Sequence, residues 1–140
     1  MKGQAAIEYL LLFSIIFVIL SFLTYYAQDA TERNREEIII SNSMIAVNKI
    51  TEASDIVYTQ GTPSQITLSI YIPEKVYNIS FSNNMMIMKI NVSSGITDIF
   101  SESKAPLFGN ISTDSGTKRI KVKAEKNGVT GESYVNITES

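Results

Sequence analysis

The sequence predicts an α+β protein in which a long N-terminal helix packs, through its C-terminal half, on a small antiparallel β-sheet or sandwich domain. Three observations favour this class: an uncharged apolar run over residues 9–26, a stretch without proline or glycine over residues 28–58, and repeated apolar alternation after residue 64. The helix is expected over residues 4–58 and the β-rich domain over residues 59–140.

The first half of this helix, residues 4–27, is apolar nearly all round. Between residues 9 and 26 the only polar non-aromatic residues are Ser14, Ser21 and Thr24. A helix over these residues would be ~27 Å long, close to the ~30 Å hydrocarbon core of a bilayer. Lys2 and the α-amino group precede the run, so the positive-inside rule predicts a cytoplasmic N-terminus and an external C-terminal domain. Residues 24–29 offer no A-x-A-like cleavage site, so the helix is expected to stay attached.

The second half, residues 28–58, is amphipathic. One face is apolar, and Gly61 followed by Pro63 predicts where the helix ends. The apolar face consists of Ile39, Ala46, Ile50, Ala53 and Val57. The polar face carries Glu32, Arg35, Glu36, Asn48, Lys49, Glu52 and Asp55. Such a helix needs a single apolar partner surface, which the rest of the chain supplies.

Six or seven short antiparallel strands are expected in that partner domain. Their ranges are residues 65–72, 76–81, 85–92, 96–100, a short strand or loop at 106–109, then 117–124 and 129–137. Alternation predicts which side chains share a face: Tyr77, Ile79 and Phe81 on the second strand, and Ile120 and Val122 on the sixth. Asn127-Gly128 is the strongest hairpin signal, so the last strand is expected to begin at residue 129.

Composition excludes several functional classes. The chain has no Cys and no His, which excludes disulfides, Cys/His metal sites and His-based acid–base catalysis. A net charge of −2 gives no basic footprint for nucleic acid. No phosphate-binding glycine loop, nucleophile elbow or calcium-loop spacing is present. We therefore expect neither an enzyme nor a cofactor.

The N-terminal residues carry a recognisable pattern. Lys2, Gly3 and Gln4 occur in order, and Glu8 is followed by the unbroken apolar run. This pattern resembles the class III signal peptide of archaeal type IV pilins over roughly residues 2–26, with Ala6 where Ser is more often found. The resemblance implies a leader of residues 1–3 that a prepilin peptidase removes between Gly3 and Gln4. It also places Glu8 fifth in the cut chain, where these pilins usually have Glu.

This resemblance implies the structural subunit of an extracellular type IV pilus, a helical homopolymer that serves in adhesion. Before assembly the precursor would be located in the cytoplasmic membrane. An assembly ATPase and a membrane platform would then build the filament. The new ammonium at Gln4 of one subunit would pair with Glu8 of another and set their register, because an unpaired buried charge is unfavourable. The alternatives are a minor pilin or a membrane-anchored surface binding protein, an archaellin-like subunit, and a plain signal anchor whose Glu8 reaches the interface.

Four N-x-S/T sequons lie in the expected external domain and none in the helix. Their asparagines are Asn78, Asn91, Asn110 and Asn136. They are candidate N-glycosylation sites, and glycans there would cover strand edges and raise solubility. The alternative is chance occurrence in a domain rich in Asn and Ser.

Overall fold

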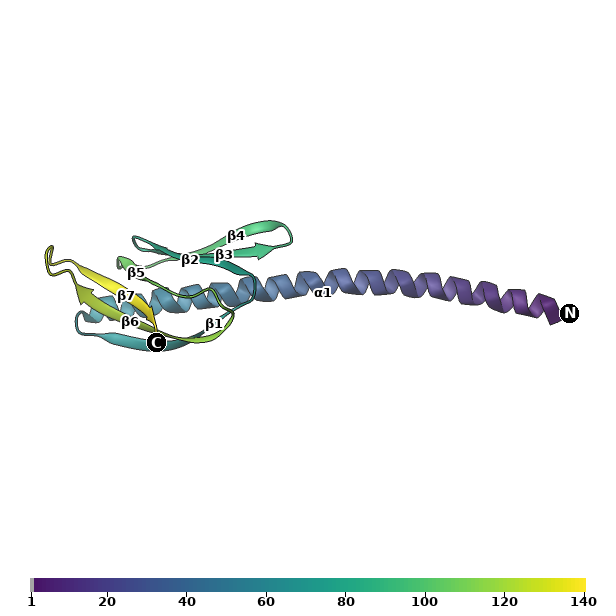
Figure 1. Cartoon of the computed structure of the whole chain (residues 1–140), viewed down its shortest axis with the longest axis horizontal. Helices are drawn as coiled ribbons and strands as arrows, with labels where there is room; N and C mark the ends of the chain where they lie inside the picture. Colours follow the sequence, from purple (N-terminus) through teal and green to yellow (C-terminus); the bar gives the residue numbers. More distant parts are fainter. Residues whose placement is uncertain (1) are drawn as a thin grey trace. The chain divides into compact units, whose positions relative to one another are not determined.

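The computed structural model describes residues 2–140, with only the backbone described for residues 2, 3 and 5. Helix α1 (Lys2–Gln60) comes first and seven strands follow (Figure 1). The strands are β1 (Gln65–Ile72), β2 (Val76–Ser82), β3 (Met85–Val92), β4 (Gly95–Glu102), β5 (Leu107–Asn110), β6 (Gly116–Lys126) and β7 (Ser133–Glu139). The expected α+β class is thus confirmed.

Contacts divide the chain into two compact units, and the boundary lies within α1. The first unit ends at Glu37, and the second is Ile38–Ser140. The C-terminal part of the helix therefore belongs to the same compact unit as the strands. An apolar helical stripe needs a partner surface, and the strands provide it.

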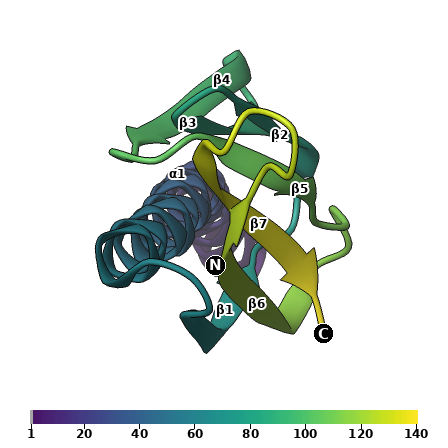
Figure 2. The ribbon, with the colours of Figure 1, turned by 90° about the vertical axis from the view of Figure 1, so that its left-hand side faces the viewer.

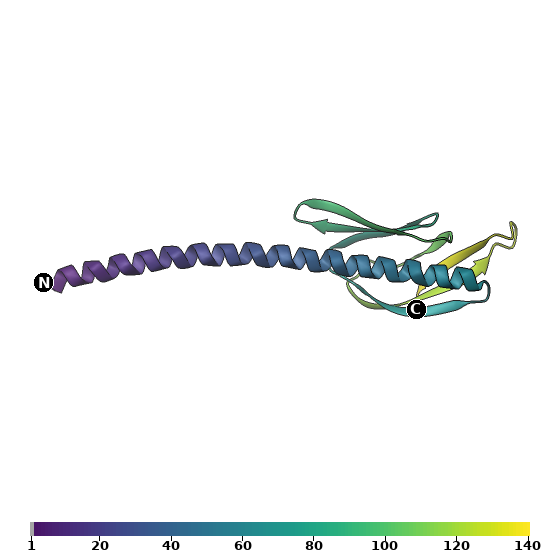
Figure 3. The same cartoon turned by 180° about the vertical axis from the view of Figure 1, so that it is seen from behind.

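Two sheets accompany this part of the helix. One has four strands in the order β1-β6-β7-β5, and the other is the meander β2-β3-β4. Seen from the end and from behind, the two sheets lie on different sides of the helix (Figures 2 and 3). The core forms where the helix and the inner faces of both sheets meet.

The core combines residues from the helix and from both sheets. The expected apolar face of the helix is confirmed, since Ala46, Ile50, Ala53 and Val57 are buried and Ile39 is half-buried. The sheets add fully buried aliphatic and methionine side chains, each stabilising the fold by about 1.5–3 kcal/mol. The largest of these are Ile72, Met86, Met88, Ile90, Leu107, Ile120 and Ile137.

The helix ends at Gln60, directly before the glycine that was expected to stop it. Gly61 has φ 76°, and its N–H donates to the carbonyl oxygens of Val57 at 3.1 Å and Tyr58 at 3.2 Å. This left-handed conformation is inexpensive only for glycine, and it satisfies carbonyls that the helix would otherwise leave unpaired. The chain can then reverse into β1.

The last strand begins later than the Asn127-Gly128 signal predicts. β7 starts at Ser133, and Asn127 N–H instead donates to the Glu132 carbonyl at 2.9 Å across a longer loop. A two-residue turn would have placed Gly131 and Ser133 opposite the buried residues of β6. The longer loop slides the strand so that Val135 and Ile137 fill those core positions opposite Ala124 and Val122. Burial of two aliphatic side chains therefore overrides the local turn preference.

Two further details differ from expectation. A bulge between Val76 and Asn78 turns Tyr77 outward, to 70% exposure, while Ile79 and Phe81 face the core as predicted. The β5–β7 pair is parallel rather than antiparallel. The chain reverses its direction between β5 and β6 and again between β6 and β7. β7 therefore runs in the same direction as β5.

Candidate functional site

The first candidate site is the apolar segment, residues 9–26 of α1. Its large side chains are exposed throughout; Phe17 is 72% exposed and Leu10 is 71% exposed. Within the described residues, one helix, Ala6–Gln60, is long and apolar enough to cross a membrane, with a window of mean hydropathy 2.5. Contiguous apolar surface on this scale marks an interaction site for lipid or protein.

The few polar groups of the segment are satisfied within the helix. The hydroxyls of Ser14, Ser21 and Thr24 each donate, at 2.8 Å, to the carbonyl oxygen four residues earlier. A hydroxyl in an apolar medium is costly only when it lacks a hydrogen bond. The segment can therefore enter lipid, or a bundle of apolar helices, with its hydroxyl groups already hydrogen-bonded.

The residues of the pilin-like pattern lie at the beginning of the same helix. Gln4 and Glu8 have exposed side chains, and Gly3, which has no side chain, is described only as part of the helix backbone. The Gly3–Gln4 bond falls in the first turn of α1, where backbone N–H groups have no intrahelical acceptor. Opening this bond to a peptidase therefore breaks few hydrogen bonds, and Glu8 stays on the helix that remains.

The second half of the helix holds a polar contact that the sequence did not reveal. Asp55, assigned to the solvated face, is half-buried, and its Oδ1 accepts from Ser103 Oγ and from Lys104 N–H, both at 2.7 Å. Thr51 Oγ1 lies 3.0 Å from Ser101 Oγ. These bonds join α1 to β4 and the loop after it.

The four sequon asparagines occupy the outer faces of both sheets. Asn78, Asn91 and Asn110 are exposed, whereas Asn136 is half-buried. Asn78 on β2 is paired with Lys89, and Asn91 lies two residues further along β3, so this pair shares one outer face. The parallel register of β5 and β7 places Phe108 opposite Asn136, so Asn110 and Asn136 share the outer face of the other sheet.

Asn136 belongs to a polar network on that face. Glu125 Oε2 accepts from Tyr134 OH at 2.9 Å and from Asn136 Nδ2 at 3.4 Å, and Lys123 Nζ lies 3.1 Å from Oε1. The hydrogen bond from Lys123, then that from Tyr134, lowers the pKa of Glu125 below its ordinary value. The carboxylate in turn raises the pKa of Tyr134.

An aromatic hollow lies beside this network. The rings of Phe108 and Tyr134 are 5.5 Å apart with their planes at 88°. They line an open hollow of about 530 Å³ together with Lys126, Asn127, Gly128 and Asn136. The spacing Phe108-x-Asn110 is visible in the sequence. It places the two side chains on one face only because both residues lie on one strand, β5.

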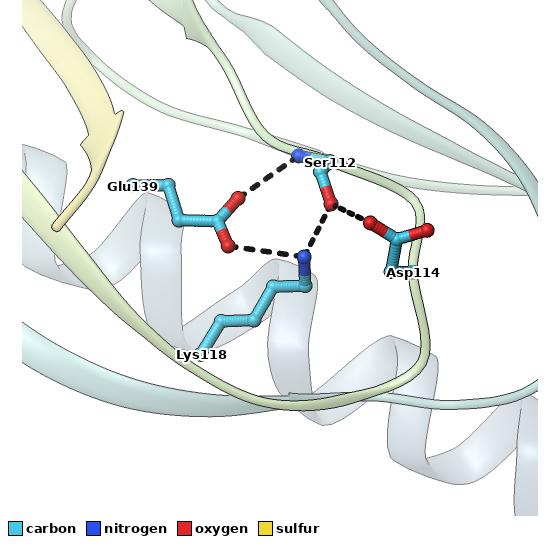
Figure 4. Close-up of polar contacts among 4 residues, drawn as sticks. All are labelled: Ser112, Asp114, Lys118 and Glu139. Carbon is cyan, nitrogen blue, oxygen red and sulfur yellow. Dashed lines mark hydrogen bonds and ion pairs between the residues drawn. The ribbon is translucent and has the colours of Figure 1, made fainter.

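The loop after Asn110 is held by a second polar cluster (Figure 4). Ser112 N–H donates to Glu139 Oε2 at 3.2 Å, and Ser112 Oγ donates to Asp114 at 2.7 Å and accepts from Lys118 Nζ. Lys118 also donates to Glu139 Oε1 at 3.0 Å. Lys118, followed by the Ser112 N–H, lowers the pKa of the Glu139 carboxyl. The cluster joins the ends of β5, β6 and β7.

Within residues 2–140, no group of three or more Asp, Glu, His or Cys side chains is arranged to hold a metal ion. No protein-family model matches the chain, and neither a curated protein nor a solved structure matches it. The candidate sites are thus defined by their own geometry: an apolar helix that needs a partner, and two sheet faces that carry sequons.

Proposed function

We propose that this chain is the structural subunit of an extracellular filament of the archaeal type IV pilus kind. The precursor lies in the cytoplasmic membrane with its β-domain outside, and a prepilin peptidase removes residues 1–3. Residues 5–26 then leave lipid and bundle with the same segment of other copies, in a step driven by an assembly ATPase on a membrane platform. Adhesion to surfaces or to other cells is the role that the resemblance to these filaments suggests.

The apolar segment of the helix carries the proposal. Its large side chains are exposed and its hydroxyls are hydrogen-bonded internally, so it suits two environments equally well, lipid and a bundle of similar helices. Moving from one to the other requires no apolar side chain to meet water. The exchange replaces lipid contacts by helix–helix packing.

Glu8 determines the register between neighbouring copies in the proposed filament. Cleavage after Gly3 leaves an ammonium group on Gln4, one helical turn before the carboxylate. In a bundle of apolar helices, the ammonium of one copy neutralises Glu8 of its neighbour. Breaking a buried ion pair costs about 3–5 kcal/mol, whereas its net contribution to stability is small. The pair therefore fixes the register between copies more than it holds them together.

Two substitutions separate cleavage from assembly. Changing Gly3 to a bulky residue should leave uncut precursor in the membrane and abolish filaments. Changing Glu8 to Val should allow cleavage but strongly reduce the filament yield. Glu32→Val is the matched control, because Glu32 is an exposed carboxylate of the same unit outside the apolar segment. The measurements are N-terminal sequencing and the quantity of chain in sheared surface material.

Sheared filaments whose subunits begin at Gln4 would support the proposal. A mature chain that begins at Met1 and stays in the membrane fraction would make the protein an anchored surface binding protein instead. Filaments present at the normal yield with Glu8→Val would remove the proposed role of Glu8. A chain found only as a trace component of filaments would make it a minor subunit.

A further inference from the structure

Asn110 follows an aromatic residue, Phe108, by two positions on its own strand. Phe108 and Asn110 are alternate residues of β5, so both side chains stand on the same outer face, roughly 6.8 Å apart along the strand. Phe108 contacts Tyr134 but remains 56% exposed, and Asn110 is also exposed. An apolar ring thus stands beside an asparagine that is open to modification.

The residue between them fixes this arrangement. A Cβ on Gly109 would lie 2.1 Å from the carbonyl oxygen of Ile137 on β7, so only glycine allows the two strands to approach this closely. β5 is an edge strand of its sheet, with β7 on one side. The close approach holds Phe108 and Asn110 in a defined register at the edge of this sheet.

We propose that Asn110 carries an N-linked glycan whose first sugar packs against the ring of Phe108. The donor is a lipid-linked oligosaccharide phosphate. The amide nitrogen of Asn110 forms a bond to the anomeric carbon, the bond from that carbon to the phosphate oxygen breaks, the phosphate takes the electron pair, and the amide proton passes to a base of the transferase. The inference rests on the external location of the domain in the proposed function, but not on filament assembly.

Packing between a sugar and this ring has a clear physical basis. One face of a pyranose presents mainly C–H groups, which bury apolar surface when they lie over an aromatic ring. The negative face of the ring favours the slightly positive C–H groups. The glycan would also cover the edge of β5 and hinder strand addition by another chain.

Asn136 provides an internal contrast. It also follows an aromatic residue by two positions, Tyr134, on the same sheet face. Its Nδ2, however, donates to Glu125 Oε2 at 3.4 Å, and the same carboxylate oxygen accepts from Tyr134. A glycan on Asn136 would crowd this half-buried network, whereas the Asn110 side chain makes no hydrogen bond within residues 2–140 that a glycan would displace. Of this pair, Asn110 is the sequon compatible with the fold.

The sequon hydroxyl indicates when the transfer takes place. In the folded chain, Ser112 Oγ already donates to Asp114 and accepts from Lys118 (Figure 4). A transferase that recognises the sequon through this hydroxyl needs it free. Transfer to Asn110 therefore requires this exposed cluster around Ser112 to open.

The test uses the full-length chain produced in a host with an N-glycosylation pathway of known glycan. Mass spectrometry of glycopeptides should show the Asn110 peptide modified and the Asn136 peptide unmodified. A double-mutant cycle then compares Phe108→Ala in the glycosylated chain and in the Asn110→Gln background, because the contact of Phe108 with Tyr134 cancels between them. We expect the Tm loss to be about 4 °C larger when the glycan is present.

Two further variants sharpen the cycle. Phe100→Ala removes an exposed aromatic ring of the other sheet and should cost the same with and without the Asn110 glycan. Phe108→Tyr keeps a ring and should preserve the coupling. An unmodified Asn110 peptide, or equal Tm losses for Phe108→Ala in both backgrounds, would overturn the inference. Both readouts are obtained on membrane-extracted protein, so they remain informative whether or not the chain forms filaments.

Discussion

Removing the Asp55 carboxylate should destabilise the compact unit through the loop that it holds. Ser103 is only 4% exposed, and its hydroxyl donates to Asp55 Oδ1 at 2.7 Å. In Asp55→Ala that buried hydroxyl loses its acceptor, at a cost of about 1–3 kcal/mol. Lys104 N–H is exposed, so water replaces its bond at little cost. We therefore expect a loss of about 2 kcal/mol in the free energy of unfolding.

The assay is pulse proteolysis of the full-length chain in non-ionic detergent across a urea series, which reports the unfolded fraction. Asp55→Asn keeps a carbonyl acceptor and should lose less than Asp55→Ala. Glu52→Ala changes an exposed carboxylate on the same helix and should stay within about 0.5 kcal/mol of wild type. Ser103→Ala should recover part of the loss when added to Asp55→Ala. A loss below about 0.5 kcal/mol for Asp55→Ala would refute the role assigned to this contact.

Two other predictions concern the sheet β1-β6-β7-β5. Gly109→Ala should destabilise the unit by about 1–3 kcal/mol, because the new Cβ meets the Ile137 carbonyl oxygen; an unchanged Tm would show that β5 and β7 can separate freely. Lys118 and Ser112 lower the pKa of Glu139, so its stabilising effect is complete above the ordinary value of 4.5 and is lost as pH falls through the lower folded-state pKa. Urea midpoints of wild type and Glu139→Gln should therefore differ at neutral pH and converge in acid, whereas a constant difference would contradict this assignment.

Much of the fold follows from local patterns. Apolar spacing identified the buried helix face that includes Ile50 and Val57, and alternation identified the inward residues of β6. Gly61 marked the end of the helix within two residues. These features are predictable because helix and strand periods act over a few residues, and burial then selects one face.

The features that escaped prediction depend on contacts between distant residues. The start of β7 is set by which residues meet Val122 and Ala124, and not by the turn itself. The helix pattern places Asp55 on the polar face, yet its hydrogen-bond partners lie in a loop 48 and 49 positions away. The hydrogen bond from Asn136 to Glu125 likewise appears only when β6 and β7 pair, so the sequence alone could not rank the sequons.

The central claim is that residues 5–26 exchange lipid for copies of themselves. Because the chain has no Cys, a single introduced cysteine reports one position. Phe17→Cys lies in the apolar segment, and Val129→Cys lies in a surface loop where Val129 is 95% exposed. In sheared filaments free of lipid and detergent, a membrane-impermeant maleimide should label Val129→Cys rapidly and leave Phe17→Cys unlabelled. Equally rapid labelling at both positions would contradict a filament core built from this segment.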